Sequence, residues 1–308
     1  MKISVVSPVY RAEKIVPELV RRIKETMESL PHTYEIVLVE DGSPDKSWQV
    51  IEEACKEHPE VVGIKLSRNF GQHYAITAGL AESIGDVVIV MDCDLQDDPK
   101  YIPELLEGQD RGAEIIYTEK TSRKHSWFKN LTAQLFNQVF NYLIDNKHWK
   151  ASGAIGSYSL LSRKAVNAYL EIKDYRRHYL MVLRWLGFPS HTIQIEHSAR
   201  FEGKSSYTFS KLVQHALDGI TSQSDKLLRL TMFAGFVLSA LAFVVAVIVV
   251  LLTIYSGFSA GWPSLFVLIL FIGGLIISSI GISGLYIGKI FEQTKNRPLY
   301  LIDKKINK

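Results

Sequence analysis

A window of 59 residues, 230–288, contains no Asp, Glu, Lys or Arg, although the 308-residue chain carries 35 basic and 32 acidic side chains. Within it, residues 230–254 and 263–287 are two almost continuously apolar runs of 25 residues each. As a helix each would be about 37 Å long, enough to cross a hydrocarbon core of about 30 Å. A hairpin buried in a soluble protein is disfavoured, because two helices that are apolar all round need a larger domain to cover them. The sequence therefore predicts a two-helix membrane anchor.

The anchor divides the chain into a domain over 1–229, the transmembrane pair over 230–288 and a basic tail over 289–308. Lys and Arg residues flank the pair on both outer sides, whereas the connection 255–262 has no charge. By the positive-inside rule the domain and both termini are cytoplasmic. The first apolar run is too short for a signal peptide, and Cys55 and Cys93 are expected to stay reduced. A net charge of +3 gives no reason to expect nucleic acid as a partner.

The first part of the chain alternates between short β-branched runs and helix-like stretches. The runs are 3–9, 34–40, 61–66 and 86–91, and the clearest helical stretches are 15–30 and 48–58. This alternation predicts an α/β domain with a mostly parallel sheet covered by helices. Polar clusters follow the runs, at 10–13, 41–45, 67–71 and 92–97. Ligands bind at the carboxyl ends of such strands, and the absence of a Gly-x-Gly-x-x-Gly or Walker sequence disfavours the commonest nucleotide-binding folds.

Two further segments, 127–143 and 209–220, have apolar residues at helical spacing opposite polar ones. Such helices either pack on the sheet or lie in the lipid headgroup layer, and the pattern is compatible with both.

Asp92 and Asp94 end one of the buried runs. Side chains alternate along a strand, so these two carboxylates face one side. Paired carboxylates with open coordination positions suit Mg²⁺ or Mn²⁺ bound to phosphates, although solvated loop acids are an equal alternative for a lone Asp-x-Asp.

In this context the chain resembles the family-two glycosyltransferases with a GT-A fold, a Rossmann-like, mostly parallel sheet. Within them it is similar to the polyprenyl-phosphate glycosyltransferases, such as the bactoprenol glucosyltransferases and dolichol-phosphate mannose synthase. The matching stretches are residues 7–13, 39–45, 68–71 with Ala78 and Gly79, 91–99 and 200–207. They occur in the family's order, and the paired apolar runs at the carboxyl end resemble the bacterial members.

The resemblance implies a role for each matching position. The nucleotide-sugar site would comprise Pro8, Tyr10, Glu13, Asp41, Arg68, Asn69, Asp92, Gln96 and Asp97. Asp94 would hold the Mg²⁺ or Mn²⁺, and the catalytic residues would be Asp92, Asp94 and Arg200. The lipid phosphate would be bound by Arg200, Lys204, Ser205 and Ser206. Outside the matching stretches, Arg123, Lys124 and Lys129 at the start of an amphipathic segment and Arg163 near Ser157 are further candidates for this phosphate. A plain turn is the alternative for 41–45, and ordinary solvated surface or attraction to anionic lipid is the alternative for the cations.

One position departs from the family. Many bacterial members carry an Asp, taken as the catalytic base, where this chain has Ser157. The loss is chemically tolerable, because a phosphate monoester is largely a dianion at neutral pH and can attack without a general base.

Taken with these observations, the resemblance implies an inverting, metal-dependent enzyme of the bacterial inner membrane. It would transfer one hexose, glucose or galactose, from a UDP-sugar to undecaprenyl phosphate, for modification of surface polysaccharide or lipopolysaccharide such as O-antigen. The alternatives are a transferase with another sugar or a non-phosphate acceptor, and a non-catalytic membrane module that binds nucleotide sugar. Gly273, Gly274, Gly281 and Gly284 in the second apolar run would allow close helix contacts in a homo-oligomer, or would face lipid.

Overall fold

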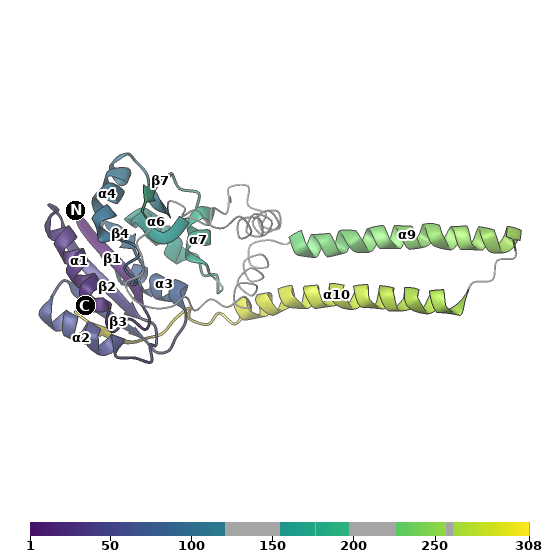
Figure 1. Cartoon of the computed structure of the whole chain (residues 1–308), viewed down its shortest axis with the longest axis horizontal. Helices are drawn as coiled ribbons and strands as arrows, with labels where there is room; N and C mark the ends of the chain where they lie inside the picture. Colours follow the sequence, from purple (N-terminus) through teal and green to yellow (C-terminus); the bar gives the residue numbers. More distant parts are fainter. Residues whose placement is uncertain (121–154, 176, 197–225, 257–260, 308) are drawn as a thin grey trace. The chain divides into compact units, whose positions relative to one another are not determined.

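The computed structural model describes residues 1–120, 155–175, 177–196, 226–256 and 261–307 (Figure 1). The chain divides into two compact units. One consists of Met1–Ser126, Ala151–Ser206 and Arg297–Lys308, and the other of Trp127–Lys150 and Tyr207–Asn296. The segments 127–143 and 209–220, expected to be amphipathic helices, lie outside the described residues.

Eight described strands form one sheet in the first unit, in the order β7-β5-β6-β4-β1-β2-β3-β8. They are β1 (Lys2–Val9), β2 (Thr33–Glu40), β3 (Val61–Leu66), β4 (Val87–Val90), β5 (Ile115–Lys120), β6 (Ile155–Ser162), β7 (Ser190–Ile195) and β8 (Ile302–Ile306). Strands β4, β1, β2 and β3 are parallel, β5 and β7 also pair in parallel, and β6 and β8 are antiparallel to their neighbours. This mostly parallel arrangement confirms the predicted α/β fold.

Helices cover both faces of the sheet, which gives three layers. The helices are α1 (Val16–Glu28), α2 (Ser47–Glu57), α3 (Gln72–Glu82), the 3-10 turn η1 (Pro99–Tyr101), α4 (Ile102–Asp110), α6 (Arg163–Glu171) and α7 (Tyr179–Trp185). Residues of α1, α2 and α4 join the core on one face, and residues of α3, α6 and α7 join the core on the other. The central strands are buried on both sides, which is why they read as continuous apolar runs rather than alternating ones.

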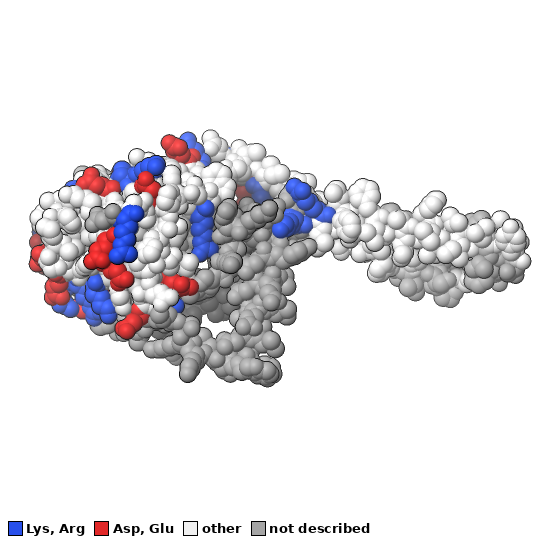
Figure 2. All heavy atoms as spheres, turned by 90° about the horizontal axis from the view of Figure 1, so that it is seen from above, with Lys and Arg blue, Asp and Glu red and all other residues white. Residues whose placement is uncertain are grey.

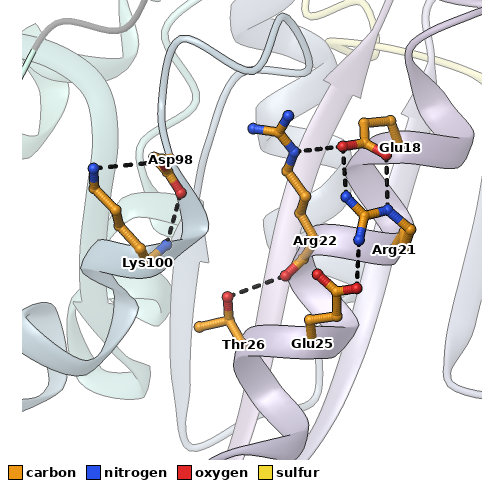
Figure 3. A network of polar contacts seen from close by, with 7 residues as sticks. All are labelled: Glu18, Arg21, Arg22, Glu25, Thr26, Asp98 and Lys100. Atoms are coloured by element: carbon orange, nitrogen blue, oxygen red, sulfur yellow. Dashed lines mark hydrogen bonds and ion pairs between the residues drawn. The ribbon is translucent and has the colours of Figure 1, made fainter.

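Helix α1 shows how the sequence divides between core and solvent. Its buried residues Val16, Leu19, Val20, Ile23 and Met27 recur at helical spacing. On the exposed side, Glu18 accepts hydrogen bonds from Arg21 at 2.7 Å and from Arg22 at 2.6 Å (Figure 3). Exposed ion pairs of this kind contribute little to stability, so burial of the apolar face is what holds α1 on the sheet.

The carboxyl-terminal segment corrects one sequence expectation. Residues 289–308 were expected to be a basic tail, but 289–294 continue a long helix and residues 302–306 form β8, which pairs with β3 at the edge of the sheet. The charged residues of β8 point to solvent, as is common on edge strands, and they made the segment resemble a tail. The first unit therefore contains both ends of the chain.

The second unit contains two long apolar helices, α9 (Lys226–Ser256) and α10 (Trp262–Thr294). Each includes a stretch long and apolar enough to cross a membrane, Leu228–Val245 and Phe271–Thr294. Large apolar side chains on them are exposed, for example Phe243 at 71% and Ile277 at 72%. Charged residues are scattered over the first unit and missing from most of the length of this helical pair (Figure 2). These are candidate membrane spans, at the positions that the sequence predicts.

Candidate active site

The four polar clusters predicted from the sequence meet at one edge of the sheet. Because β1, β2, β3 and β4 are parallel, their carboxyl ends lie side by side, and the clusters 10–13, 41–45, 67–71 and 92–97 follow those ends. Hydrogen bonds join the loop after β2 to the loops after β1 and β3, so these turns are not independent of one another.

Asp41 connects the loop after β2 with the loop after β3. Its carboxylate accepts hydrogen bonds from the backbone N–H groups of Phe70 at 2.7 Å and Gly71 at 2.9 Å. The side chain is only 3% exposed, and this burial raises the pKa of Asp41 to about 6 despite the two donors. The role of Asp41 in binding a base or ribose stays a prediction. In the structure the same carboxylate holds the loop after β3 in place through these two hydrogen bonds.

Gly42 brings the backbones of these two loops into direct contact. Its φ of +61° lies in the left-handed region, and a Cβ at this position would be 2.3 Å from the backbone nitrogen of Asn69. Only glycine fits here without moving the 68–69 backbone. Arg68 and Asn69 are themselves exposed, and the Arg68 guanidinium lies 4.3 Å from the centre of the Phe70 ring.

The loop after β1 is bonded to the loop after β2 as well. The backbone N–H of Arg11 donates to Ser43 Oγ at 3.0 Å, and that of Lys46 donates to Glu13 Oε2 at 3.0 Å. Tyr10 is 43% exposed at this edge, whereas Pro8 is buried within β1. Tyr10 is thus open to a ligand, while Glu13 is engaged in holding the loop; their roles as pocket walls stay predictions, together with that of Pro8.

The acidic turn after β4 has an unusual backbone. Leu95 is buried and has a φ of +58°, a left-handed conformation that is uncommon for residues other than glycine and that clusters at active sites and ligand-binding turns. The backbone N–H of Gln96 donates to Asp94 Oδ1 at 3.1 Å. Both Asp92 and Asp94 are half-buried.

Asp92 is surrounded by polar side chains from three other segments. Gln72 Nε2, at the start of α3, donates to Asp92 Oδ1 at 2.6 Å, and Ser157 of β6 lies close enough to the same carboxylate to favour its charged form. Burial and the negative charge of Asp97 raise the pKa of Asp92 to about 7. Asp97 is buried, which raises its pKa, and pairs with Lys120 Nζ at 3.0 Å. The turn thus concentrates negative charge.

Three of these residues were not assigned a role from the sequence. Ser157 was noted only as a departure from the family, and it lies beside the acidic turn because β6 pairs with β4. Gln72 and Lys120 carry no motif of their own. The position of Lys120 at the carboxyl end of β5 is the one signal that could have identified it.

The residues of the acidic turn fit a divalent cation. Asp92 and Asp94 offer hard oxygen ligands in an environment with excess negative charge, which favours Mg²⁺ or Mn²⁺. No group of three His, Cys, Asp or Glu side chains converges among the described residues. A cation held here would therefore take the rest of its ligands from water and from the phosphates of a bound substrate.

The structure contradicts the prediction for Arg163. This side chain was expected to bind the acceptor phosphate, but its Nε donates to the carbonyl of Gly85 at 2.8 Å, and its backbone N–H donates to the carbonyl of Asp86. Both carbonyls precede β4, so Arg163 lies at the opposite edge of the sheet from Asp92. Strand β6 runs antiparallel to β4 and carries Ser157 to one edge and Arg163 to the other.

The other residues expected at the acceptor phosphate lie outside the described part of the chain. These are Arg123, Lys124, Lys129, Arg200, Lys204, Ser205 and Ser206.

Known proteins resemble this chain over most of its length. The model of glycosyl transferase family 2 matches residues 4–170, more than half of the chain. A bactoprenol glucosyl transferase derived from the SfII prophage of Shigella flexneri is 34% identical, over 99% of this chain and 98% of its own. The undecaprenyl-phosphate 4-deoxy-4-formamido-L-arabinose transferase of Proteus mirabilis is 35% identical, over 98% of this chain and 93% of its own.

Among solved structures, mannosyl-3-phosphoglycerate synthase from Rubrobacter xylanophilus superposes with a TM-score of 0.51 at 16% identity, over 74% of each chain. That likeness concerns the fold alone. The family model and the relatives that align over nearly the full chain carry the assignment, and the chain belongs to glycosyl transferase family 2.

Proposed function

We propose that this enzyme transfers a single hexose, glucose or galactose, from a UDP-sugar to undecaprenyl phosphate at the cytoplasmic face of the bacterial inner membrane. One observation carries the proposal. The acidic turn of Asp92 and Asp94 lies beside the loops expected to hold a nucleotide, in a chain that aligns end to end with transferases named for bactoprenol and undecaprenyl phosphate. The lipid-linked sugar would serve in modifying surface polysaccharide such as O-antigen.

In the proposed reaction a phosphate oxygen of the acceptor forms a bond with the anomeric carbon as the bond from that carbon to the UDP oxygen breaks. Attack from the face opposite UDP inverts the configuration, and the electron pair leaves with UDP. Asp94, supported by Asp92, would hold Mg²⁺ or Mn²⁺, which neutralises charge on the departing diphosphate. Arg68, Asn69, Tyr10 and Gln96, which are not buried, would contact the donor, whereas Asp97, buried and paired with Lys120, would act by holding the turn.

A side-chain base is not required in this scheme. Ser157, at the position where the family resemblance implies an Asp, lies beside Asp92, and a neutral hydroxyl is not suited to proton removal at neutral pH. The acceptor phosphate is already largely a dianion at that pH, so it brings its own nucleophilic oxygen. We assign Ser157 to the support of Asp92.

The course of the chain supports a topology in which the start of α9 and the end of α10 lie on the same side of the membrane. The first unit holds Ala151–Ser206 and again Arg297–Lys308, so the chain passes from the first unit into the second and returns to the first. If both helices cross the membrane, their outer ends emerge on one side, and Lys and Arg residues flank those ends. The acceptor phosphate would lie at the same interface, and anchoring the enzyme in the membrane would raise the effective concentration of this acceptor.

A panel assay tests the proposal. Membranes containing the protein are incubated with undecaprenyl phosphate, Mn²⁺ or Mg²⁺ and radiolabelled UDP-, GDP- or dTDP-sugars, and label is counted in the lipid extract. We expect label from a UDP-hexose, its loss with chelator, and its loss in Asp94→Asn. Asp86→Asn is the matched control, because Asp86 is an exposed carboxylate at the opposite end of β4.

Two results would favour the alternatives. Transfer of label to a lipid or glycan without a phosphate group would show that undecaprenyl phosphate is not the acceptor. Nucleotide-sugar binding without transfer to any acceptor would indicate a non-catalytic module. Full turnover by Asp94→Asn in the presence of chelator would refute the assignment of the metal.

A further inference from the structure

The last strand, β8, lies against β3, the strand that leads into residues 67–71, which are called the donor loop because they are expected to bind the nucleotide sugar. It pairs antiparallel with β3, with Gly63 opposite Ile306 and Leu66 opposite Ile302, and an irregularity follows Lys65. Only residues 295–301 separate it from the end of α10. Ile302 and Ile306 also pack against the two cores on either face of the sheet. The edge of the catalytic sheet is therefore completed by chain that follows the helical pair.

Asn307 fixes the far end of this strand. Its side-chain amide donates to the carbonyl of Cys55, in α2, at 2.6 Å. It also donates to the carbonyl of Val61, the first residue of β3, at 2.8 Å. The residue has a φ of +62°, a conformation that Asn tolerates better than most residues. Lys305 adds an ion pair with Glu82 of α3 at 2.7 Å, although an exposed pair of this kind contributes little. Asn307 is thus the principal side-chain attachment of β8.

At its other end the segment reaches the donor loop itself. The backbone N–H of Ser67 donates to the carbonyl of Leu301 at 2.9 Å, one residue before Arg68. On its other side the loop is held by Asp41, which accepts from Phe70 and Gly71. Residues 67–71 are therefore held from two directions, by the β2 loop and by the carboxyl-terminal segment.

We infer that β8 is a positioning strand, which holds residues 67–71 in the conformation that binds the nucleotide sugar, with Asn307 as its anchoring side chain. The inference rests on the proposed function, because it takes that loop as part of the donor site. Coupling of this kind is reciprocal. If β8 stabilises the donor-binding loop, donor binding stabilises the pairing of β8 with β3.

Hydrogen exchange on the full-length protein in detergent tests the coupling. UDP-glucose with Mn²⁺ is expected to protect residues 41–45 and 67–71 directly and to slow exchange of the 302–306 amides by about fivefold or more. Protection of the two loops with unchanged exchange at 302–306 would overturn the inference and leave the proposed function standing. If no nucleotide sugar protected the loops, the proposed function would fail and the inference with it.

A matched pair of variants tests the anchoring residue. Asn307→Ala is expected to raise the KM for the nucleotide sugar about three- to tenfold with kcat unchanged, and to speed exchange at Ser67. Asn296→Ala is the control, because Asn296 also has a positive φ, 46°, but its side chain forms no hydrogen bond to another described residue. Equal effects of the two variants, or a fall in kcat alone, would contradict a positioning role. The exchange experiment on the wild type decides the question should Asn307→Ala not fold.

Discussion

Substitution of Gly42 by alanine should disrupt the donor site by separating two loops that touch through their backbones. A Cβ at this position would lie 2.3 Å from the nitrogen of Asn69 and 2.5 Å from the carbonyl carbon of Arg68. Neither atom belongs to a flexible side chain, so the overlap can be relieved only by moving the 68–69 backbone. That movement would strain the hydrogen bonds from Phe70 and Gly71 to Asp41.

Two contributions lower the free energy of unfolding of Gly42→Ala, and they add. Alanine in a left-handed conformation costs about 1–2 kcal/mol relative to glycine, and forced overlap in a packed region costs about 1–3 kcal/mol. Gly112 provides the control, because it has a φ of +87° and an added Cβ would meet nothing within 4 Å. Gly112→Ala should therefore show the conformational cost alone. The difference between the two variants, about 1–3 kcal/mol, measures the contact between the loops.

Urea unfolding in detergent gives the two changes in free energy, and calorimetric titration with UDP-glucose and Mn²⁺ gives the change in donor affinity. We expect Gly42→Ala to bind the donor about tenfold more weakly or worse, at 1.4 kcal/mol per factor of ten, and Gly112→Ala to bind it normally. Equal loss of stability in both variants with unchanged donor affinity would refute the loop contact as a part of the site.

Three further predictions concern single side chains. Because burial raises the pKa of Asp41 to about 6, the folded protein holds this proton more tightly than the unfolded chain. Its stability should therefore fall by up to about 3 kcal/mol from about pH 4 to about pH 7, and unfolding at several pH values should show this slope removed in Asp41→Asn. Gln72→Ala removes a donor to Asp92 and should raise the Mn²⁺ concentration for half-maximal activity about tenfold, read from metal titrations of the transfer rate. Arg163→Ala should lower the unfolding free energy by about 2 kcal/mol and leave the KM for undecaprenyl phosphate unchanged; a raised KM would return Arg163 to the acceptor site.

The central strands were predictable because they are buried on both faces, which forces continuous β-branched runs such as residues 86–91. Strand β8 was not, because an edge strand needs few apolar residues and its partner, β3, is far away in the sequence. In the site, too, contacts between residues that are distant in the sequence could not be predicted. The acids after β4 follow from strand periodicity, whereas the contact of Gln72 with Asp92 depends on how α3 begins. Arg163 was misplaced because antiparallel pairing of β6 separates residues that lie close together in the sequence.

The charges of the acidic turn bear on how the donor would bind. Asp92, Asp94 and Asp97 lie within six residues, and burial together with the negative charges of Asp97 and Asp94 raises the pKa of Asp92 to about 7. Lys120 is already paired with Asp97, so it offsets part of this negative charge before any ligand arrives. A diphosphate brought to this turn by itself would be repelled, whereas a diphosphate that carries Mg²⁺ or Mn²⁺ would supply the missing positive charge. The cation should therefore be needed for binding as well as for departure of UDP. Chelation should then abolish calorimetric binding of UDP-glucose as well as its turnover. Donor binding of equal strength with and without the cation would show that the cation acts in the chemical step alone.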